Sequence, residues 1–391
     1  MAGNHTERKH SLLSPSGAHR WMVCTKSPEL EARFPDTRSE AAAEGTLAHE
    51  IAEIKLRGYF FATEWTKRKV TTAINKKKKE SLYQEEMLGY TDDYVEEIKK
   101  VALSFNSAPV VAVEDECNLE MYIPEEGAHG SPDCILIHQG EMHVFDFKYG
   151  KGVPVSAVRN PQMMLYALGA YQRYKLIYEI DKVVLHIVQP RIDNFSTWET
   201  NREEILSFGE VVKETAGLAL SGKGEFNPDE NACRFCRARA VCRARAEKNV
   251  ELAFAVDKKP ETLSDAEIGE YLSKGTDVAR WLEDVKEYAL SACLAGRNIE
   301  GWKAVEGRSV RKWTDQEKAF ETLKEKGIAE AVLYERKPIT LASVEKLVGK
   351  KDFSEMVGEF IATPPGKPTL VDISDKREAI TNATKAADVF K

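Results

Sequence analysis

The residues of this sequence that are best suited to chemistry are two acids and a base, Asp133, Asp146 and Lys148. The residues around them predict two antiparallel strands joined by a two-residue turn at Gln139-Gly140. With that turn, Asp133 faces Asp146 across the strand pair, and Lys148 lies on the same side of the sheet. Two facing carboxylates repel each other unless a cation lies between them. The stretch therefore predicts a divalent metal site beside a lysine, whereas a three-residue turn would place the two aspartates on opposite faces.

Three further polar residues are expected on helices before and after this stretch. A helix predicted over about 39–58 carries His49 and, one turn earlier, Gly45, where the missing side chain leaves room for a close approach. Gln162 and Tyr166 are four positions apart and share one face of the next predicted helix. Taken singly, such a histidine is more often structural than a ligand, and an Asp-x-Lys pair is usually a surface ion pair. Their combination is what indicates a site.

Cysteines form a second candidate site. The spacing Cys233-x2-Cys236-x5-Cys242 places three thiolates within ten residues, and a fourth ligand must come from elsewhere in the chain. Cys24 lies at a polar helix end, whereas the three remaining cysteines lie in apolar segments that are typical of small core residues. Four thiolates suit either zinc or an iron–sulfur cluster, and the spacing does not distinguish the two.

Composition excludes some classes of protein. The chain has 391 residues, 42% of them apolar, and no apolar run long enough to span a membrane or to act as a secretion signal, which predicts a cytoplasmic protein. Seven cysteines in such a compartment argue against a disulfide framework. The net charge of −7 does not by itself favour nucleic-acid binding, but it hides local basic segments such as the lysine run 76–79. We predict a solvated loop for the surrounding residues 63–82, with a phosphate-contacting arm as the alternative.

The order of the predicted elements favours an α/β core with a mixed sheet. The predicted helices and strands between residue 92 and the cysteines are a helix over 92–105, a strand over 110–123, the central strand pair, a helix from 161, a strand over 183–189 and a helix over 203–220. Later elements are predicted as helices over 265–294, 315–326 and 341–360, with a short hairpin over 299–311. We predict one domain over 1–250 and a mostly helical α+β accessory region over 251–391.

The motifs together resemble a known family. Their order, Gly45-x3-His49, Gly130-x2-Asp133, Asp146-x-Lys148 and Gln162-x3-Tyr166, resembles the RecB-type nucleases of the PD-(D/E)xK superfamily. One early cysteine and a late Cys-x2-Cys-x5-Cys are similar to the iron–sulfur branch of those nucleases, as in AddB-type helicase-nucleases and CRISPR adaptation exonucleases. The sequence as a whole is also similar to a group of phage and prophage proteins.

The resemblance implies roles for individual residues. It implies a restriction-endonuclease-like core in which Mg²⁺ or Mn²⁺ is bound by His49, Asp133, Asp146 and the main-chain carbonyl of Phe147. Lys148 then stabilises developing charge or positions the nucleophile. Gln162 and Tyr166 orient the substrate phosphate or the lysine. Cys24, Cys233, Cys236 and Cys242 are implied to hold a 4Fe–4S cluster, with zinc as the less favoured occupant.

The function implied is that of a metal-dependent DNA exonuclease. Such an enzyme, if encoded by a phage, acts in the host cytoplasm in DNA recombination, replication or repair, on a DNA substrate and alongside a phage single-strand-binding or annealing protein. Two alternatives remain from the sequence. One is a non-catalytic DNA-binding recombination module with the same fold, and the other is a regulatory protein stapled by zinc.

Overall fold

The computed structural model describes residues 12–35, 40–254, 265–305, 315–326, 329–334, 341–357 and 360–361. Its contacts divide the chain into two compact units, Met1–Ala289 and Leu290–Lys391. The predicted division after residue 250 stays a prediction. The functional residues named above all belong to the first unit.

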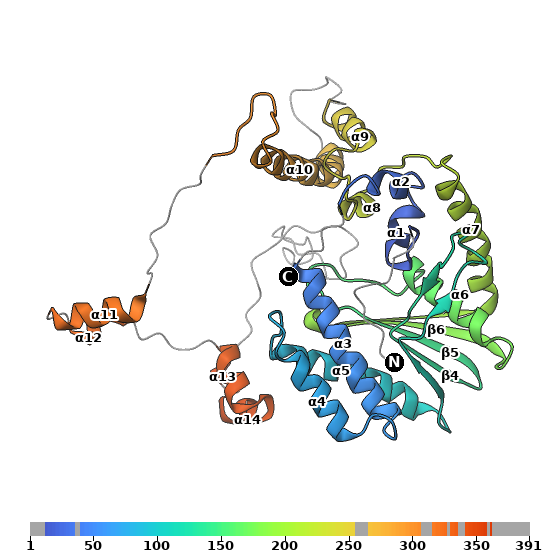
Figure 1. Ribbon diagram of the computed structural model, residues 1–391, viewed down its shortest axis with the longest axis horizontal. Coiled ribbons are helices and arrows are strands. Elements are labelled where there is room, and N and C mark those ends of the chain that lie inside the picture. Colours follow the sequence, from blue (N-terminus) through green and yellow to red (C-terminus); the bar gives the residue numbers. More distant parts are fainter. Residues whose placement is uncertain are drawn as a thin grey trace, which may run out of the picture. The chain divides into compact units, whose positions relative to one another are not determined.

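A five-stranded sheet forms the centre of the first unit (Figure 1). Its strands, in spatial order, are β1 (Val110–Val113), β4 (Cys134–His138), β5 (Gly140–Phe147), β6 (Ile180–Gln189) and β7 (Asn194–Asn201). The pair β5–β6 is parallel and the other pairs are antiparallel. The predicted α/β class with a mixed central sheet is therefore confirmed. A separate two-stranded sheet consists of β2 (Cys117–Asn118) and β3 (His129–Gly130).

The turn between β4 and β5 has the predicted length. Gln139 and Gly140 both adopt positive φ, 43° and 87°, as the two central residues of a type I′ turn do. Cys134 then pairs with Phe145, and the same register continues to the turn. One step beyond Cys134, this register places Asp133 opposite Asp146, as predicted.

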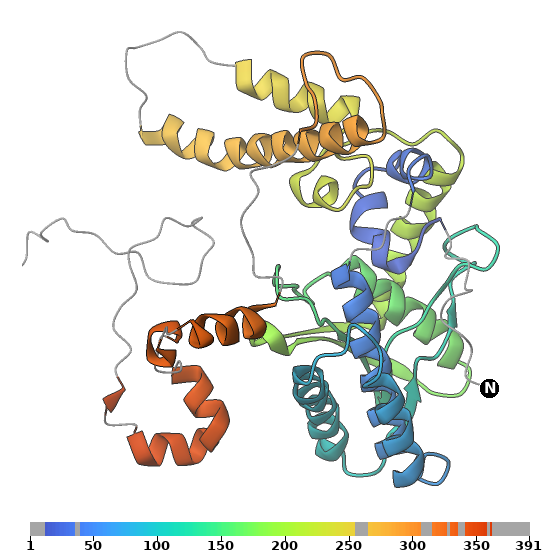
Figure 2. The same cartoon turned by 60° about the vertical axis from the view of Figure 1, so that its left-hand side comes forward.

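Helices cover both faces of the sheet (Figures 1 and 2). The helices on one face are α3 (Glu40–Phe60) and α5 (Glu86–Ser104), and those on the other are α6 (Pro161–Tyr174) and α7 (Arg202–Leu220). On β5, Phe145 and Phe147 join the core beneath α3 and α5, whereas Met142 and Val144 join the core beneath α6 and α7. Because successive residues of a strand alternate between faces, Asp146 belongs to the α6 side.

The start of α6 follows from its first residues. The Asn160 side chain accepts hydrogen bonds from the backbone amides of Gln162 and Met163, and Pro161 occupies the first turn. Gln162 and Tyr166 are thereby fixed on one face of the helix, as predicted.

Residues 63–82 do not form the predicted loop. They contain α4 (Lys67–Lys77), whose first turn is capped by the Thr66 hydroxyl, which accepts a hydrogen bond from the Lys69 amide. The helix lies along α3, where Val70 packs at Gly58. Gly58 does not end α3 as predicted, because its missing Cβ makes room for Val70 while the helix continues to Phe60.

Two other elements have different boundaries from those predicted, and one strand was not predicted. The strand predicted over 110–123 ends at Val113, because Glu114 adopts a left-handed conformation with φ of 51°. Helix α5 begins at Glu86, earlier than predicted. Strand β7 was not predicted, since its alternating residues are only half-buried.

The cysteine-rich part of the first unit is built from short helices. These are the 3₁₀ turn η1 (Pro15–Gly17), α1 (Ala18–Trp21), α2 (Ser27–Glu31), α8 (Glu230–Arg234) and α9 (Arg243–Phe254), which precede the long α10 (Asp265–Leu294). The bounds of α10 match the prediction.

Beyond residue 294 the described segments are short helices. They are α11 (Gln316–Glu325), α12 (Glu330–Leu333), α13 (Leu341–Val348) and α14 (Lys350–Val357). The single helix predicted over 341–360 is interrupted at Gly349, where φ is 88°. The hairpin predicted over 299–311 is described only up to residue 305 and contains one bridge, between Ile299 and Trp302.

Candidate metal centre

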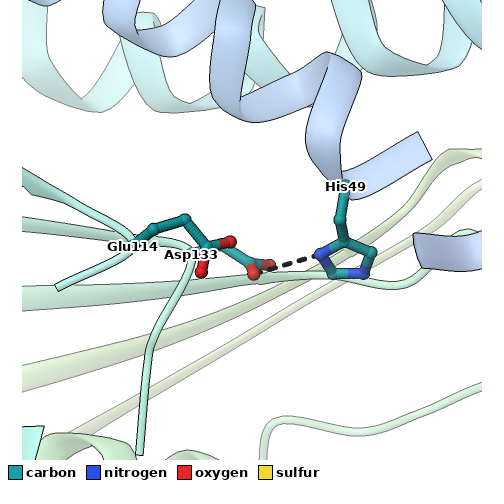
Figure 3. Close-up of side chains that lie close together, drawn as sticks. All are labelled: His49, Glu114 and Asp133. Atoms are coloured by element: carbon teal, nitrogen blue, oxygen red, sulfur yellow. Dashed lines mark hydrogen bonds and ion pairs between the residues drawn. The ribbon is translucent and has the colours of Figure 1, made fainter. Parts of the chain in front are cut away.

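A histidine and two carboxylates come together at the end of the sheet (Figure 3). His49 extends from α3, and its Nδ1 lies 3.1 Å from Asp133 Oδ1. The carboxylate of Glu114 lies beside them, so that donor atoms of all three residues are within 4.8 Å of one another. Among the described residues, this is the one group of three or more histidine, cysteine or carboxylate side chains with that geometry.

Asp133 is held in place by the backbone. Its second carboxylate oxygen accepts a hydrogen bond of 2.6 Å from the Phe147 amide, and its own carbonyl accepts one from the Glu114 amide. The Phe147 ring packs against the His49 ring, with centroids 5.3 Å apart. The predicted role of the Phe147 carbonyl as a metal ligand stays a prediction.

A chain of polar side chains continues from Asp146 to α6. Lys148 Nζ lies 2.9 Å from Asp146 Oδ2 and donates a hydrogen bond of 2.8 Å to Gln162 Oε1. The Gln162 amide nitrogen lies 3.3 Å from Asp146 Oδ1 and 3.0 Å from the Tyr166 hydroxyl. All four residues predicted for this part of the site are therefore in contact, and Asp146 and Lys148 share one side of the sheet as the alternation requires.

Tyr166 also explains the glycine at the start of the motif. A Cβ at Gly130 would lie 2.9 Å from the Tyr166 ring and 3.1 Å from Pro15. At Gly45, by contrast, an added Cβ would meet no described atom within 4 Å. The predicted close approach at Gly45 is thus not made by the described part of the protein.

Glu114 was not predicted from the sequence. It was placed inside a longer predicted strand, where it is the first of three consecutive acids, residues 114–116. The sequence feature that could have identified Glu114 is its position directly after the apolar run Val110–Val113, where the chain leaves the strand.

The charges in the centre influence one another strongly. Burial disfavours the charged form of His49, but the Asp133 carboxylate outweighs this and raises the pKa of His49 to about 9. Burial and the negative charge of Asp133 raise the pKa of Glu114 to about 9. Although burial opposes it, the His49 imidazolium keeps the pKa of Asp133 below its usual range. The protons on His49 and Glu114 thus supply the positive charge that the carboxylates require.

The residues fit a bound divalent cation. Asp146 Oδ2 is buried, and the Lys148 ammonium forms an ion pair with it at 2.9 Å. The carboxylates of Glu114 and Asp133 are oxygen donors that suit a hard cation, and the imidazole of His49 favours Mn²⁺, whereas the predicted ligand Asp146 lies outside this group of three. The His49 side chain is 31% exposed, so the centre is open to solvent.

The four predicted cysteine ligands line one pocket. Its walls combine Cys24 with Cys233, Cys236 and Cys242, although Cys24 is far from the others in sequence. A hydrogen bond links the two segments that carry these cysteines. The backbone amide of Asn227, 203 residues after Cys24, donates to Cys24 Sγ at 3.5 Å. The four thiols form no group of three with sulfurs within 4.8 Å of one another among the described residues. A tetrahedral zinc site has sulfurs only about 3.8 Å apart.

Three arginines that form ion pairs with acids lie beside these thiols. Arg20, Arg239 and Arg245 line the same pocket. Arg245 is 1% exposed and forms ion pairs with Asp277 at 2.9 Å and Asp284 at 2.7 Å, both on α10. Its Nε atom is buried without a partner. Burial raises the pKa of the Cys236 thiol to about 12 and also raises the pKa of the Cys233 thiol, so a bound metal group would have to stabilise these thiolates.

The family model described as "Protein of unknown function (DUF2800)" matches residues 10–378. The chain belongs to this family. The match of this DUF2800 chain extends over the metal centre, the cysteine pocket and most of the second unit. Among solved structures it is similar to the one described as "Crystal structure of SSO0001", with 16% identity over 50% of this chain and 85% of that chain, and a TM-score of 0.22. A TM-score this low does not establish a shared fold.

No described helix of the chain has the length and apolar character that a membrane span needs.

Proposed function

We propose that this DUF2800 chain is a metal-dependent DNA exonuclease of the RecB type, with a PD-(D/E)xK core. The observation that carries the proposal is the convergence of His49, Glu114 and Asp133 next to the Asp146–Lys148 pair. This combination offers a hard-cation site with a fixed ammonium group beside it, which is the arrangement that phosphodiester hydrolysis needs.

Each residue of the site would have a separate role in hydrolysis. His49, Glu114, Asp133 and Asp146 would hold Mg²⁺ or Mn²⁺, which when bound lowers the pKa of a coordinated water and polarises the scissile phosphate. Lys148 would stabilise the negative charge that develops on the phosphate oxygens, since Asp146 and Gln162 hold its ammonium group in place. Water adds to phosphorus, the bond to the leaving oxygen breaks, and that oxygen takes up a proton.

Digestion of end-labelled DNA tests this function. We expect the purified full chain with Mn²⁺ or Mg²⁺ to release nucleotides from linear DNA labelled at its 5′ or 3′ end and to leave circular DNA intact. Asp146→Asn and Lys148→Ala should each reduce the rate by about 10²-fold or more. Equal rates in wild type and both variants would contradict the proposal. DNA binding without any cleavage would favour the non-catalytic recombination module.

We propose that the cysteine pocket holds a 4Fe–4S cluster. Four thiols from two distant segments line it, and no three of these sulfurs lie within 4.8 Å of one another, whereas the sulfurs of a zinc tetrahedron do. Anaerobically purified protein should be brown, with a broad visible absorption band and about four irons per chain. Colourless protein with one zinc per chain would contradict this and support the zinc alternative.

A further inference from the structure

Helix α4 (Lys67–Lys77) carries an unusual charge for a chain with a net charge of −7. Its sequence KRKVTTAINKK has three basic residues at its start, two lysines at its end and no acidic residue, and Lys78 and Lys79 follow directly. None of its residues is buried. The helix is therefore positively charged at both ends, whereas residues 70–75 between them are uncharged.

One side of α4 is fixed against α3. Val70 packs where Gly58 lacks a side chain. At the other end of the helix, Lys77 forms ion pairs of 2.7 Å with Glu50 and 2.8 Å with Glu80. Glu50 is the neighbour of His49 on α3, so this tether holds the last turn of α4 next to the helix that supplies the candidate metal ligand. Both views of the fold show α4 alongside α3 (Figures 1 and 2).

The other side of α4 presents cations to solvent. Arg68, Lys76 and Lys79 are exposed, and none has an acidic partner among the described residues. Arg68 and Lys76 also line a shallow hollow together with Thr72. The three residues are spaced four positions apart, so they follow one another along the same side of the helix. The nine residues from Arg68 to Lys76 span roughly 12 Å. Successive phosphates of one strand advance about 3.4 Å along the duplex axis, so a stripe of this length can reach more than one of them.

We propose that the exposed cations of α4 and of the residues directly after it, Arg68, Lys76 and Lys79, bind the phosphate backbone of the nucleic acid substrate. The inference rests on the proposed function, because the neighbouring phosphodiester site is what makes nucleic acid the expected polyanion. Helices that bind membranes need large apolar side chains opposite their charged face. On α4 the corresponding residues are small or turned toward α3, which favours nucleic acid over an anionic lipid surface.

The test compares two triple variants of the full chain. One is Arg68→Gln, Lys76→Gln, Lys79→Gln. The matched control is Lys100→Gln, Lys274→Gln, Lys286→Gln, which removes the same formal charge from exposed lysines that are paired with acids on α5 and α10. Each triple is combined with Asp146→Asn, and binding to fluorescent duplex DNA is measured in EDTA at several salt concentrations. Cleavage is thus not required, and a failure of the nuclease proposal is detected separately by digestion with the native Asp146.

We expect the α4 variant to bind DNA about tenfold more weakly or worse at low salt. Its slope of log affinity against log salt should be smaller by about 2 to 3, because each lost phosphate contact removes about 0.9 from the slope. The control should match the parent protein. The inference is overturned if the two triples behave alike, or if the parent protein binds vesicles containing phosphatidylserine through α4 and does not bind DNA. Circular dichroism of both triples checks that the exposed substitutions leave the fold intact.

Discussion

The carboxylates of Glu114 and Asp133 share one partly buried space with His49, and the protons on His49 and Glu114 keep that space from becoming strongly negative. A divalent cation can replace both protons. Metal binding and proton binding are therefore competitive at this centre, and each residue of the group contributes to both.

Glu114→Gln tests whether the residue that the sequence motifs missed is a ligand. We expect the affinity for Mn²⁺, measured by isothermal titration calorimetry, to fall about tenfold or more, since one charged oxygen donor is lost. Glu116→Gln is the matched control, because Glu116 is an exposed acid two residues away. Equal affinities in the two variants would exclude Glu114 from the metal site.

The stability of the metal-free protein should decrease as the pH rises from 6.5 to 9.5. The folded protein holds protons on His49 and Glu114 up to a pKa of about 9, whereas the unfolded chain releases them near 6.5 and 4.5. Both residues therefore lose their stabilising contribution as the pH rises through 9. Thermal unfolding in EDTA should show a falling Tm, and His49→Gln should flatten the decrease. An unchanged decrease in that variant would show that other groups cause it.

Much of the site at this scale was predictable. Asp133 and Asp146 were placed opposite each other by the length of one turn, and that length follows from a glycine in a two-residue loop between alternating segments. Glu114 was not predictable in the same way. Its position depends on a left-handed residue that ends β1 early, and residues other than glycine adopt that conformation too rarely for a sequence pattern to signal it.

At the level of elements, α3 links the metal centre to the basic helix α4. It carries His49 on one side and accepts Val70 at Gly58 on another, so the packing of α4 and the position of the ligand depend on the same helix.

Gly58→Ala should therefore destabilise the protein. The new Cβ would lie 2.6 Å from a Val70 methyl group, and overpacking of this kind costs about 1–3 kcal/mol. Gly45→Ala, on the same helix with open space around it, should instead stabilise by up to about 1 kcal/mol through helix propensity. Urea unfolding measures both, and the double variant Gly58→Ala, Val70→Ala should regain stability. Equal effects of the two glycine substitutions would contradict the packing argument.

The central strands and α6 were predicted because their apolar periodicity and capping residues are strong. Helix α4 was not, because only Val70, Ala73 and Ile74 provide an apolar side, and lysines dominate the rest. The helix is stabilised by contacts with α3, and a local sequence pattern does not reveal such contacts. The same reason applies to β7, which is defined by its pairing with β6.

At the scale of the whole molecule, the cysteine pocket joins segments from the beginning and the later part of the first unit. Cys24 belongs to the segment that also places Pro15 against Gly130 near the metal centre. Arg245 connects the same pocket to α10 through Asp277 and Asp284. The pocket thus brings together three parts of the chain that are distant in sequence: the N-terminal segment with Cys24, the later cysteine segment and α10.

Cys24→Ser and Cys242→Ser should each lower both metal content and thermal stability. Loss of a thiolate ligand removes the group that ties these segments together, and its binding free energy is also folding free energy. Cys293→Ser is the control, because this thiol lies outside the pocket. Iron and zinc analysis with thermal unfolding should separate the variants. Normal iron content in either pocket variant would remove that cysteine from the ligand set.

The contact between Cys24 and the Asn227 amide spans 203 residues, and this separation sets a minimum time during synthesis. A ribosome adding about 5–20 residues per second needs roughly 10–40 s to make the intervening chain. Throughout that interval the N-terminal segment exists without its partners and with a free thiol. The newly made protein therefore passes through a stage in which the sheet can form while the pocket is open, and exposure to oxygen during that stage would oxidise Cys24 before it can join the other three cysteines.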